Sequence, residues 1–576
     1  MKLKRFPRFI QVFLTALTLL ASSIALSACF QDQTYDSYYG RVVVPREQQF
    51  RWIDGTLPRT VDPAFAAAPP DTDLVRAIFE GLTDYDPRTL EPVPAVAKHW
   101  ESANDGRTWT FYLREEARWS NGEAVVAKDF VESWRRTMRI GDLAPHTDLL
   151  SNIVGAAAVS VPDVPARSSN ARTARETSEI TARQRADARF GAEAVEEHVL
   201  RVRLQIPDLN FPALVAHPVF RPIKVAADNS LKRIDASGLV SNGAFLLANQ
   251  DENRVLLHRA ENYWARSEIN LERVEFVGAV NAEAALAAYR AGEVDAVTNS
   301  AFEPLALKLL APYQDFRREI YGALTYYSFN LAHEPFDDVR VREALAIAID
   351  RERLSQDEMG GATEPAKKFL PELKTQSARA VVSKTELLER DAERARSLLA
   401  EAGYPDGRGF PVVRLLINRN EQQRLIATSI AAMWRSILNV ETEISIKGWD
   451  EYETAVREGD YDVVRRGMVM QTTDELTNIR AIFQQDTQPA NPVDAGETGA
   501  AAPKTRGKVS PEPARISAIE SEADALKELR AIPLYFASSH ALVKPYVTGF
   551  DSNLLDVPSL RRVRIDTTWI GPEKTR

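Results

Sequence analysis

The stretch "RTWTFYLREEARWSNGEAVVAKDFVESWRRTM", residues 107–138, contains the periodicities of both a strand and a helix. Apolar Trp109, Phe111 and Leu113 alternate with hydroxyl-bearing residues, which is the two-residue period of a half-buried strand. Asn121-Gly122 then marks a tight turn. From Asp129 onward, apolar residues recur at the spacing of an amphipathic helix: Phe130, Val131, Trp134 and Met138. These aromatic residues are assigned to core packing rather than to chemistry.

Two helices are predicted further along the chain. Residues 281–297 contain a helix of strong helix formers that ends at Gly292, followed by a short strand at 293–297. Residues 336–354 form a second helix, with Asp337 or Asp338 as its N-cap. Its buried face carries Val341, Ala344, Leu345, Ala348 and Ile349.

A strand–helix–strand unit follows in the second half of the chain. A helix at 390–407 precedes it and is stopped by Gly403 and Pro405. Residues 412–417 and 440–446 are predicted strands, and they flank a helix at 421–437. The fold class is therefore α/β, and the chain length suggests two or three lobes.

The composition excludes several function classes. With 72 Lys and Arg against 81 Asp and Glu, the net charge is -9, which argues against a nucleic-acid binder. A single cysteine rules out an intrachain disulfide and a Cys-rich zinc site. The sequence has no closely spaced histidine pair, phosphate-binding loop, dinucleotide fingerprint or nucleophile elbow. We therefore expect no metal, no cofactor and no enzymatic activity.

The N-terminus has the pattern of a secretory signal, predicted to cover residues 1–28. "MKLKRFPRF" carries four basic residues, and the apolar run "VFLTALTLLASSIAL" at 12–26 is too short to span a membrane. Leu26-Ser27-Ala28-Cys29 resembles the bacterial lipobox, which implies cleavage before Cys29 and acylation of its thiol. The alternative is an ordinary signal peptide with a chance cysteine. Residues 29–40 are polar after the first two residues and are predicted to be a short tether.

Two stretches have the composition of loops or disordered segments. Residues 160–188 are polar, and residues 487–515 hold five prolines, three glycines and no aromatic residue. Such segments bury too little apolar surface to offset the entropy lost on ordering.

Read in order, blocks of the chain resemble the oligopeptide/dipeptide-binding lipoproteins of ABC importers, the family 5 solute-binding proteins. The matching blocks include "IFEGLTDYDPRTLEPVPAVAKHWE", "GRTWTFYLREEARWSNGEAVVAKDFVESWRR", "ALAAYRAGEVDAV" and "FNLAHEPFDDVRVREALAIAIDR". The resemblance spans residues 53 to about 550. It implies a two-lobed periplasmic-binding-protein fold (type II, cluster C) with an extra domain.

The resemblance also implies how the chain is divided. Domain I would comprise residues 41–75, 220–300 and 530–576, domain II residues 76–219, and domain III residues 301–529. It further implies a monomer in the periplasm, anchored to the membrane through Cys29, that captures peptides or peptide-like solutes between its lobes. An ABC permease and its ATPase would be the partners.

The ligand-binding residues are carried over from the family's motifs. The stretch "DVVRRGMVMQTTDEL", 462–476, corresponds to the family's ligand-facing strand. Its candidates are Arg465, Gly467, Met468, Val469 and Gln471. Arg465 matches a basic residue that can pair with a ligand carboxylate. Trp449 matches a tryptophan that lines a side-chain pocket, and Thr56 and Leu57 match the opposite wall.

This chain departs from the family's pattern at three of these positions, and Met468 stands where the family has a tryptophan. Gln471 replaces the aspartate that pairs with a peptide's α-ammonium group, and Leu57 replaces a glutamate. We therefore hypothesise that the protein does not strongly select a free peptide N-terminus. Alternatively, Asp474 takes the role of the aspartate.

Other functional classes remain as alternatives. An envelope lipoprotein on the same scaffold could have lost transport and act in signalling, chaperoning or adhesion. A secreted hydrolase is disfavoured by the missing catalytic signatures. Neighbouring permease and ATPase genes would separate the first alternative from an importer.

Overall fold

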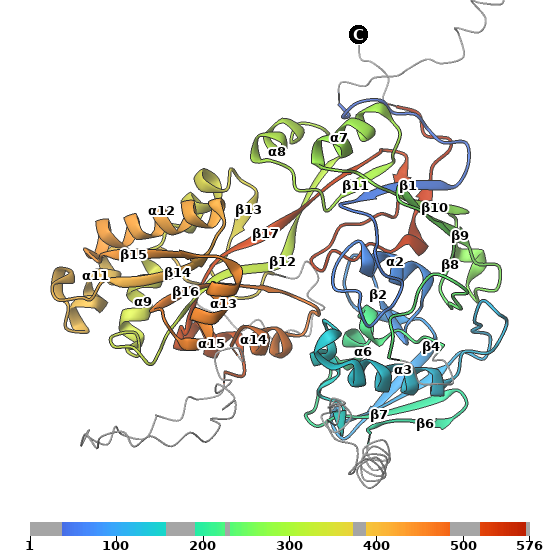
Figure 1. The fold of residues 1–576 in the computed structure, drawn as a ribbon, viewed down its shortest axis with the longest axis horizontal. Helices are drawn as coiled ribbons and strands as arrows, with labels where there is room; N and C mark the ends of the chain where they lie inside the picture. Colours follow the sequence, from blue (N-terminus) through green and yellow to red (C-terminus); the bar gives the residue numbers. More distant parts are fainter. Residues whose placement is uncertain (1–36, 157–189, 225–230, 373–386, 484–518, 572–576) are drawn as a thin grey trace, which may run out of the picture.

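The computed structural model describes residues 37–156, 190–224, 231–372, 387–483 and 519–571 (Figure 1). Its centre is one mixed sheet of eleven strands, in the order β15-β14-β16-β12-β17-β11-β1-β10-β9-β8, with β13 paired to β17. The strands are β1 (Gln49–Asp54), β8 (Phe245–Gln250), β9 (Arg254–Arg259), β10 (Arg273–Val277), β11 (Ala296–Thr298), β12 (Phe316–Phe329), β13 (Thr363–Pro365), β14 (Val413–Asn418), β15 (Thr442–Lys447), β16 (Val463–Val469) and β17 (Ala531–Val543).

The molecule has a separate large hydrophobic core at each end of this sheet. The first lobe holds a core built from residues between 42 and 276 and between 541 and 565. The second lobe holds a core built mainly from residues 324–536. The two lobes confirm the expected architecture, while the boundaries of domains I, II and III stay predictions.

The long strands β12 and β17 run from one lobe to the other. They pair antiparallel, from Phe316 opposite Leu542 to Ser328 opposite Ala531. The register shifts between Ile320 and Leu324, at the middle of the pair. Because an irregular register weakens a ladder locally, this point is where the lobes can bend relative to each other.

The opening stretch of the sequence analysis folds as predicted. A four-stranded sheet has the order β4 (Ala97–Ala103), β5 (Thr108–Leu113), β7 (Val199–Arg203), β6 (Ala192–Glu196). Trp109, Phe111 and Leu113 of β5 are buried, and α3 (Ala127–Ile140) packs against this sheet. Asp129 fixes the start of α3, because its carboxylate accepts hydrogen bonds from the Val126 N–H and the Trp119 indole.

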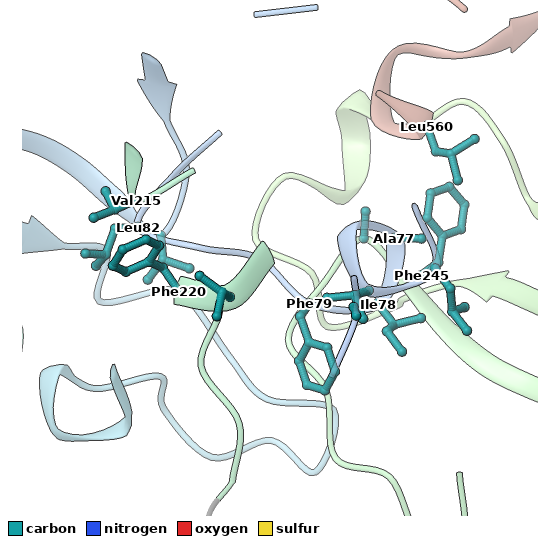
Figure 2. Packing of buried hydrophobic residues seen from close by; sticks show 14 of the residues in the cluster. Ala77, Ile78, Phe79, Leu82, Val215, Phe220, Phe245 and Leu560 are labelled. Carbon is teal, nitrogen blue, oxygen red and sulfur yellow. The ribbon is translucent and has the colours of Figure 1, made fainter. Parts of the chain in front are cut away.

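Helix α2 (Asp71–Ile78) joins the parts of the first lobe. In Figure 2, Phe79 lies toward Leu82, Val215 and Phe220, while Ala77 lies beside Phe245 and Leu560. All of these side chains are at least 94% buried and belong to one cluster. The same core therefore holds the small sheet, strand β8 and the C-terminal segment together.

The predicted strand–helix–strand unit is confirmed in the second lobe. β14 and β15 pair in parallel from Val413–Thr442 to Asn418–Lys447, and α12 (Glu421–Leu438) connects them. The helix predicted within 390–407 is α11 (Ala392–Glu401), which ends just before Gly403 as predicted.

Two other predictions need correction. The helix predicted at 336–354 is split into α9 (Val339–Ile347) and α10 (Arg351–Arg353), because the carboxylate of Asp350 caps a new start through the Arg353 N–H. Asp338, rather than Asp337, caps α9. After α7 (Ala282–Ala291), Gly292 ends the helix as predicted, but the following strand begins only at Ala296.

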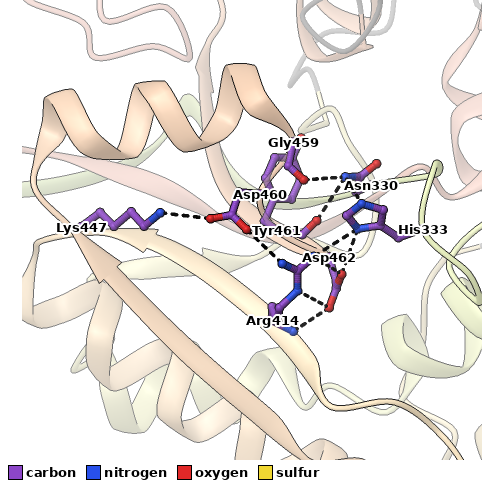
Figure 3. A network of polar contacts seen from close by, with 8 residues as sticks. All are labelled: Asn330, His333, Arg414, Lys447, Gly459, Asp460, Tyr461 and Asp462. Atoms are coloured by element: carbon purple, nitrogen blue, oxygen red, sulfur yellow. Dashed lines mark hydrogen bonds and ion pairs between the residues drawn. The ribbon is translucent and has the colours of Figure 1, made fainter. Parts of the chain in front are cut away.

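A network of opposite charges ties β14 to the start of β16 (Figure 3). Asp462 accepts hydrogen bonds from the guanidinium of Arg414, at 2.9 Å, and from the His333 ring, at 3.0 Å. Asp460 bridges Arg414 and Lys447. The amide of Asn330 donates to the carbonyl oxygens of Gly459 and Tyr461. Asp462, a match to the family's motif, therefore has a structural role here.

The remaining elements surround these layers. They are β2 (Thr83–Tyr85), β3 (Pro92–Pro94), α6 (Phe211–Leu214), α8 (Pro304–Leu310), α13 (Trp449–Glu458), α14 (Glu475–Phe483), α15 (Glu522–Glu528), β18 (Val547–Thr548) and β19 (Arg564–Ile565). Among the described residues, no helix has the length and apolarity needed to cross a bilayer. The predicted signal at 1–28, most of the tether at 29–40, and the segments 160–188 and 487–515 lie outside the described residues.

Candidate functional site

Strand β16 presents an open edge at the boundary between the lobes. It pairs with β12 along its whole length, from Val463 to Val469, but with β14 only at Val463 and Val464. Among the described residues, the edge from Arg465 to Val469 therefore has no second neighbouring strand. Gly467 and Val469 are exposed here, while Met468 is buried. An open strand edge offers a row of backbone donors and acceptors.

A cavity of about 340 Å³ lies between the lobes at the end of this strand. From the second lobe it is lined by Val469, Gln471, Thr477, Asn478, Arg480 and Ala481. From the first lobe it is lined by Asp148, Leu149, Ser151, Asn152, Gln205, Ile206, Asp208 and Leu214. The lining is part apolar and part polar, which is typical of a site that orients a ligand.

Gln471 makes a hydrogen bond across the lobe boundary to His217. The Nδ1 atom of His217 accepts from the Val219 N–H at 3.2 Å, so Nε2 carries the proton and donates to Oε1 of Gln471 at 3.1 Å. Burial, with the nearby His146, Arg76 and Arg221 among the other causes, lowers the pKa of His217 well below its usual value. The pair is therefore neutral on both sides.

Asp474 also reaches across the boundary. One of its oxygens accepts from the Asn210 side chain at 2.7 Å, and the other accepts from the Thr477 N–H at the start of α14. Asp208, beside Asn210, lines the cavity. Its burial, and then the charge of Asp474, raise the pKa of Asp208 to about 6. Two carboxylates thus lie near each other at the lobe boundary.

Trp449 and Arg465 are connected through a residue that the sequence did not single out. Trp449 is 61% exposed and its ring stacks on Tyr452 at a centroid distance of 5.6 Å. The Tyr452 hydroxyl donates to the carbonyl oxygen of Arg465. The Nε atom of Arg465 is buried without a hydrogen-bond partner in the described part of the chain. This Nε–H is therefore a buried donor whose hydrogen bond is unmet in the described structure.

Thr56 and Leu57 follow a constrained turn in the first lobe. Gly55 has a φ of 64°, and a Cβ there would lie 2.7 Å from the Asn299 carbonyl oxygen, so only glycine fits. Thr56 is exposed. Leu57 is partly buried against the first core, beside Gly278. Neither Thr56 nor Leu57 is among the residues that line the 340 Å³ cavity.

Three buried carboxyl groups lie directly behind this turn, and we call them the acidic cluster: Asp54, Asp73 and Asp556. Asp54 is 1% exposed, and one of its oxygens accepts from Thr298 at 2.8 Å and Asn299 at 2.6 Å. Asp54 and Asp73 each have one buried oxygen without a hydrogen-bond partner among the described residues. Asp556 accepts from Ser539, on the long strand β17. The cluster therefore borders the strands that join the lobes.

Burial is the main cause of raised pKa values throughout the acidic cluster. It raises the pKa of Asp54, and it raises the pKa of Asp73 further, together with the charges of Asp54 and Asp556. Burial and the charge of Asp54 raise the pKa of Asp556 to about 6. Two neighbouring buried carboxyl groups disfavour each other's ionisation, so the pKa values of Asp54 and Asp73 are raised together.

A second hollow, of about 590 Å³, lies entirely in the first lobe. It is lined by several arginines, but two of them are already paired: Arg561 with Glu80 at 2.8 Å and Arg562 with Asp86 at 2.9 Å. The third, Arg114, lies over the Trp264 ring at 3.9 Å. We favour the smaller cavity as the functional site, because residues from both lobes line it.

A family model, "Bacterial extracellular solute-binding proteins, family 5 Middle", matches residues 91–489. The chain belongs to this family. The match confirms the resemblance seen in the sequence, and it covers both the four-stranded sheet of the first lobe and strand β16 of the second.

Curated family 5 relatives cover nearly the whole chain. The periplasmic murein peptide-binding protein MppA of Escherichia coli K12 is 29% identical over 560 residues, which is 94% of this chain and 96% of MppA. The periplasmic oligopeptide-binding protein OppA of the same organism is 26% identical over 552 residues, covering 92% and 93%.

The architecture is shared as well. A solved structure of MppA in its unliganded open form is 25% identical and superimposes with a TM-score of 0.69, covering 91% of this chain and 98% of that chain. The two-lobed type II fold expected from the sequence is therefore confirmed.

The family 5 fold brings the predicted site residues together only in part. Val469 and Gln471 line the cavity, and Gly467 and Met468 belong to the strand that leads to it. Sequence reasoning missed His217, Asn210 and Asp208 of the facing lobe. Nothing in the sequence could have indicated them, because His217 is an isolated histidine 254 residues from the glutamine that it contacts.

Proposed function

We propose that this protein is an extracytoplasmic solute-binding lipoprotein of an ABC importer. It captures peptides or peptide-like solutes in the cleft between its lobes and delivers them to a membrane permease. The observation that carries the proposal is the open edge of β16, which leads into a cavity lined by both lobes. The relatives that bind murein peptide and oligopeptides support the same class of ligand.

The open edge suits a ligand with a peptide backbone. An extended peptide beside residues 465–469 adds a strand to the sheet, so main-chain hydrogen bonds provide affinity without reading side chains. Side chains of the ligand then alternate between the sheet's two faces, toward the cavity and toward Trp449. The Arg465 side chain is partly exposed beside this edge, and a guanidinium suits a carboxylate on the ligand.

Ligand capture is tested on protein purified from its own host. Native mass spectrometry should show the mature chain with bound peptides or peptide-like molecules, which are released on denaturation and identified by fragmentation. A chain that binds no peptide from its host and none from a defined peptide library would contradict the proposal.

The N-terminal end of the ligand is not selected through a positive charge. At the family's position for the ammonium-pairing aspartate, Gln471 supplies a neutral amide that is already engaged by neutral His217. A ligand that is blocked or modified at its N-terminus is therefore accepted as well as a free one. The hypothesis follows from the alignment of Gln471 with the family's aspartate.

The test compares one peptide in free and N-acetylated form by calorimetry. The two forms should bind the native protein with similar affinity. Gln471→Asp should favour the free amine by at least about tenfold, because one partner of a buried ammonium–carboxylate pair is worth about 2–5 kcal/mol. A clear preference of the native protein for the free amine contradicts the hypothesis. Asp474→Asn and Asp208→Asn then identify the carboxylate responsible.

Cys29 is proposed to be the acylated first residue of the mature protein. Each buried CH₂ group of an acyl chain contributes about 0.8 kcal/mol, so several chains hold the protein on the membrane durably. Cys29→Ser should leave the chain unacylated and move it from the membrane fraction to the soluble fraction of the envelope. A variant that stays membrane-bound like the native protein would contradict the lipid anchor.

A further inference from the structure

Exposed apolar side chains surround the point where the described chain begins, at Ser37. On α8, Leu305 is 68% exposed and Leu309 is 65% exposed. They lie four residues apart and so share one face of the helix. Leu307 and Leu310 are buried, and Leu310 packs in a small cluster with Tyr289, Val297 and Leu542. The exposed face therefore contributes nothing to the stability of the fold.

Hydrogen bonds place this face beside Ser37. The chain turns directly after α8, where the Tyr313 N–H donates to the Leu310 carbonyl oxygen at 3.0 Å. The next residue, Gln314, donates its N–H to the carbonyl oxygen of Ser37 at 2.9 Å. The end of α8 and the first described residue are thus separated by a single short turn.

A third large apolar residue is exposed close to the same point. The ring of Tyr38 contacts the ring of Trp569 edge-on, at a centroid distance of 5.8 Å. Ile570, the next residue, is 87% exposed. Three exposed aliphatic side chains from two distant parts of the chain therefore lie near the exit of the N-terminal tether.

The tether is short. Seven residues, 30–36, separate Cys29 from Ser37. Eight Cα steps span at most roughly 26–29 Å when fully extended. An acyl-anchored Cys29 thus keeps Ser37, and α8 with it, within that distance of the bilayer surface.

We propose that the exposed face of α8, with Ile570, is a membrane-contact surface that rests on the lipid bilayer beside the acylated N-terminus. The proposal rests on the lipid anchor at Cys29. Aliphatic side chains enter the boundary between headgroups and acyl chains. Lys308, exposed between the two leucines, can lay its stem along them and reach the lipid phosphates.

A bilayer fits this surface better than a protein partner does. A stable protein interface buries about 800 Å² on each side, which is far more than three aliphatic side chains supply. On their own, such residues would bind a membrane weakly. A short covalent tether raises their effective concentration at the bilayer, so a weak contact is sufficient to orient the molecule.

This orientation leaves the cleft open to the solvent. In Figure 1, α8 and α7 lie at the upper edge of the molecule, whereas α6 and α14, which contribute residues to the cavity, lie in its lower half. A protein resting on α8 therefore keeps α6 and α14, which contribute to the cavity, at a distance from the bilayer. It must leave this contact and turn before it can meet a permease with the cleft.

The test uses the lipidated mature chain in vesicles of phosphatidylethanolamine and phosphatidylglycerol. Cys29 is the only cysteine and would carry the lipid, so Leu309→Cys provides a unique thiol for an environment-sensitive dye. The matched control is Leu143→Cys, a leucine that is 76% exposed and lies just after α3, a helix in the lower half of Figure 1. The dye at 309 should shift to shorter emission wavelengths and lose most of its emission to a lipid-borne quencher. The dye at 143 should do neither.

A second variant separates the surface from the anchor. With the dye at position 309, Leu305→Glu should lose most of the shift and quenching while the protein still floats with the vesicles. Water-like emission from position 309 in floating protein overturns the membrane-contact surface and leaves the anchor standing. Equal quenching at 309 and 143 also overturns the surface. Protein that does not float overturns the anchor, and the surface with it.

Discussion

Two polar clusters, one in each lobe, accommodate buried carboxyl groups in opposite ways. In the second lobe, Asp462 is surrounded by Arg414 and His333 (Figure 3). In the first lobe, Asp54, Asp73 and Asp556 lie together and have no cation in hydrogen-bonding contact among the described residues. The first arrangement balances charge with charge, whereas in the second arrangement burial and mutual repulsion raise the pKa values of the carboxyl groups.

The difference gives the two clusters opposite pH dependences. Burial alone would raise the pKa of Asp462, but hydrogen bonds from Arg414 and His333 outweigh it and lower the pKa. Its stability contribution is present above the unfolded pKa, about 3.9, and is lost as the pH falls through the folded value. The acidic cluster has raised pKa values, so its contribution is lost as the pH rises.

The largest effect is expected from Asp462→Ala. The Asp462 side chain is 10% exposed, and its removal leaves Arg414 and His333 without their shared acceptor. We expect the free energy of unfolding to fall by about 2–4 kcal/mol. Urea denaturation at pH 7 measures this. Asp462→Asn, which keeps the shape and one acceptor, should cost less. A loss below about 0.5 kcal/mol for the alanine variant would show that the network does not stabilise the lobe.

Asp73→Asn is expected to change the stability in the opposite direction, by raising the free energy of unfolding. Asparagine imitates a protonated aspartate and can donate a hydrogen bond to Asp54 at every pH. The native cluster instead loses stability as the pH rises through about 6, the pKa of Asp556, because its carboxyl groups must either release protons or hold them at a cost. The variant should therefore gain about 1–2 kcal/mol of stability at pH 8 and almost none at pH 5, since one pKa unit corresponds to about 1.4 kcal/mol.

Denaturation at the two pH values measures this gain. Asp450→Asn is the matched control, because Asp450 is also in the first turn of a helix but is exposed. The control should lose a little stability at both pH values through the helix dipole. An Asp73→Asn variant that is destabilised equally at pH 5 and pH 8 would rule out a protonated Asp73.

The smallest effect on stability is expected from Asp460, the exposed carboxylate of the second-lobe network. Asp460 is 57% exposed and pairs with Arg414 at 3.0 Å and Lys447 at 3.4 Å. Exposed ion pairs contribute little, so Asp460→Asn should cost no more than about 0.5 kcal/mol. Added salt should abolish the difference. A larger, salt-resistant loss would show that the rim and the buried Asp462 act as one unit.

Sequence patterns predicted the local helices and strands, but they missed the contacts between residues that are distant in the sequence. Strand β5, helix α3, the Gly292 cap and the parallel pair β14–β15 follow from periodicity and capping residues, and the structure confirms them. The helix predicted at 336–354 was too long, since the pattern could not show that Asp350 starts a new turn.

The site was less accessible to sequence reasoning. The family motif located β16 and Gln471, but the facing wall comes from residues more than 250 positions away. The acidic cluster joins positions 54, 73 and 556, each of which resembles an ordinary loop or helix-start acid in the sequence. Only the folded chain shows that these three carboxyl groups share one buried space.

The position of β17 has a consequence for how the molecule is made. This strand lies between β12 and β11 in the middle of the eleven-stranded sheet, yet it comes from residues 531–543, near the end of the chain. During synthesis from the N-terminus, β12 and β11 therefore each keep one unpaired edge until residues 531–543 have been made. Unpaired edges favour aggregation, so we expect β11 and β12 to be the strands most exposed to it during synthesis.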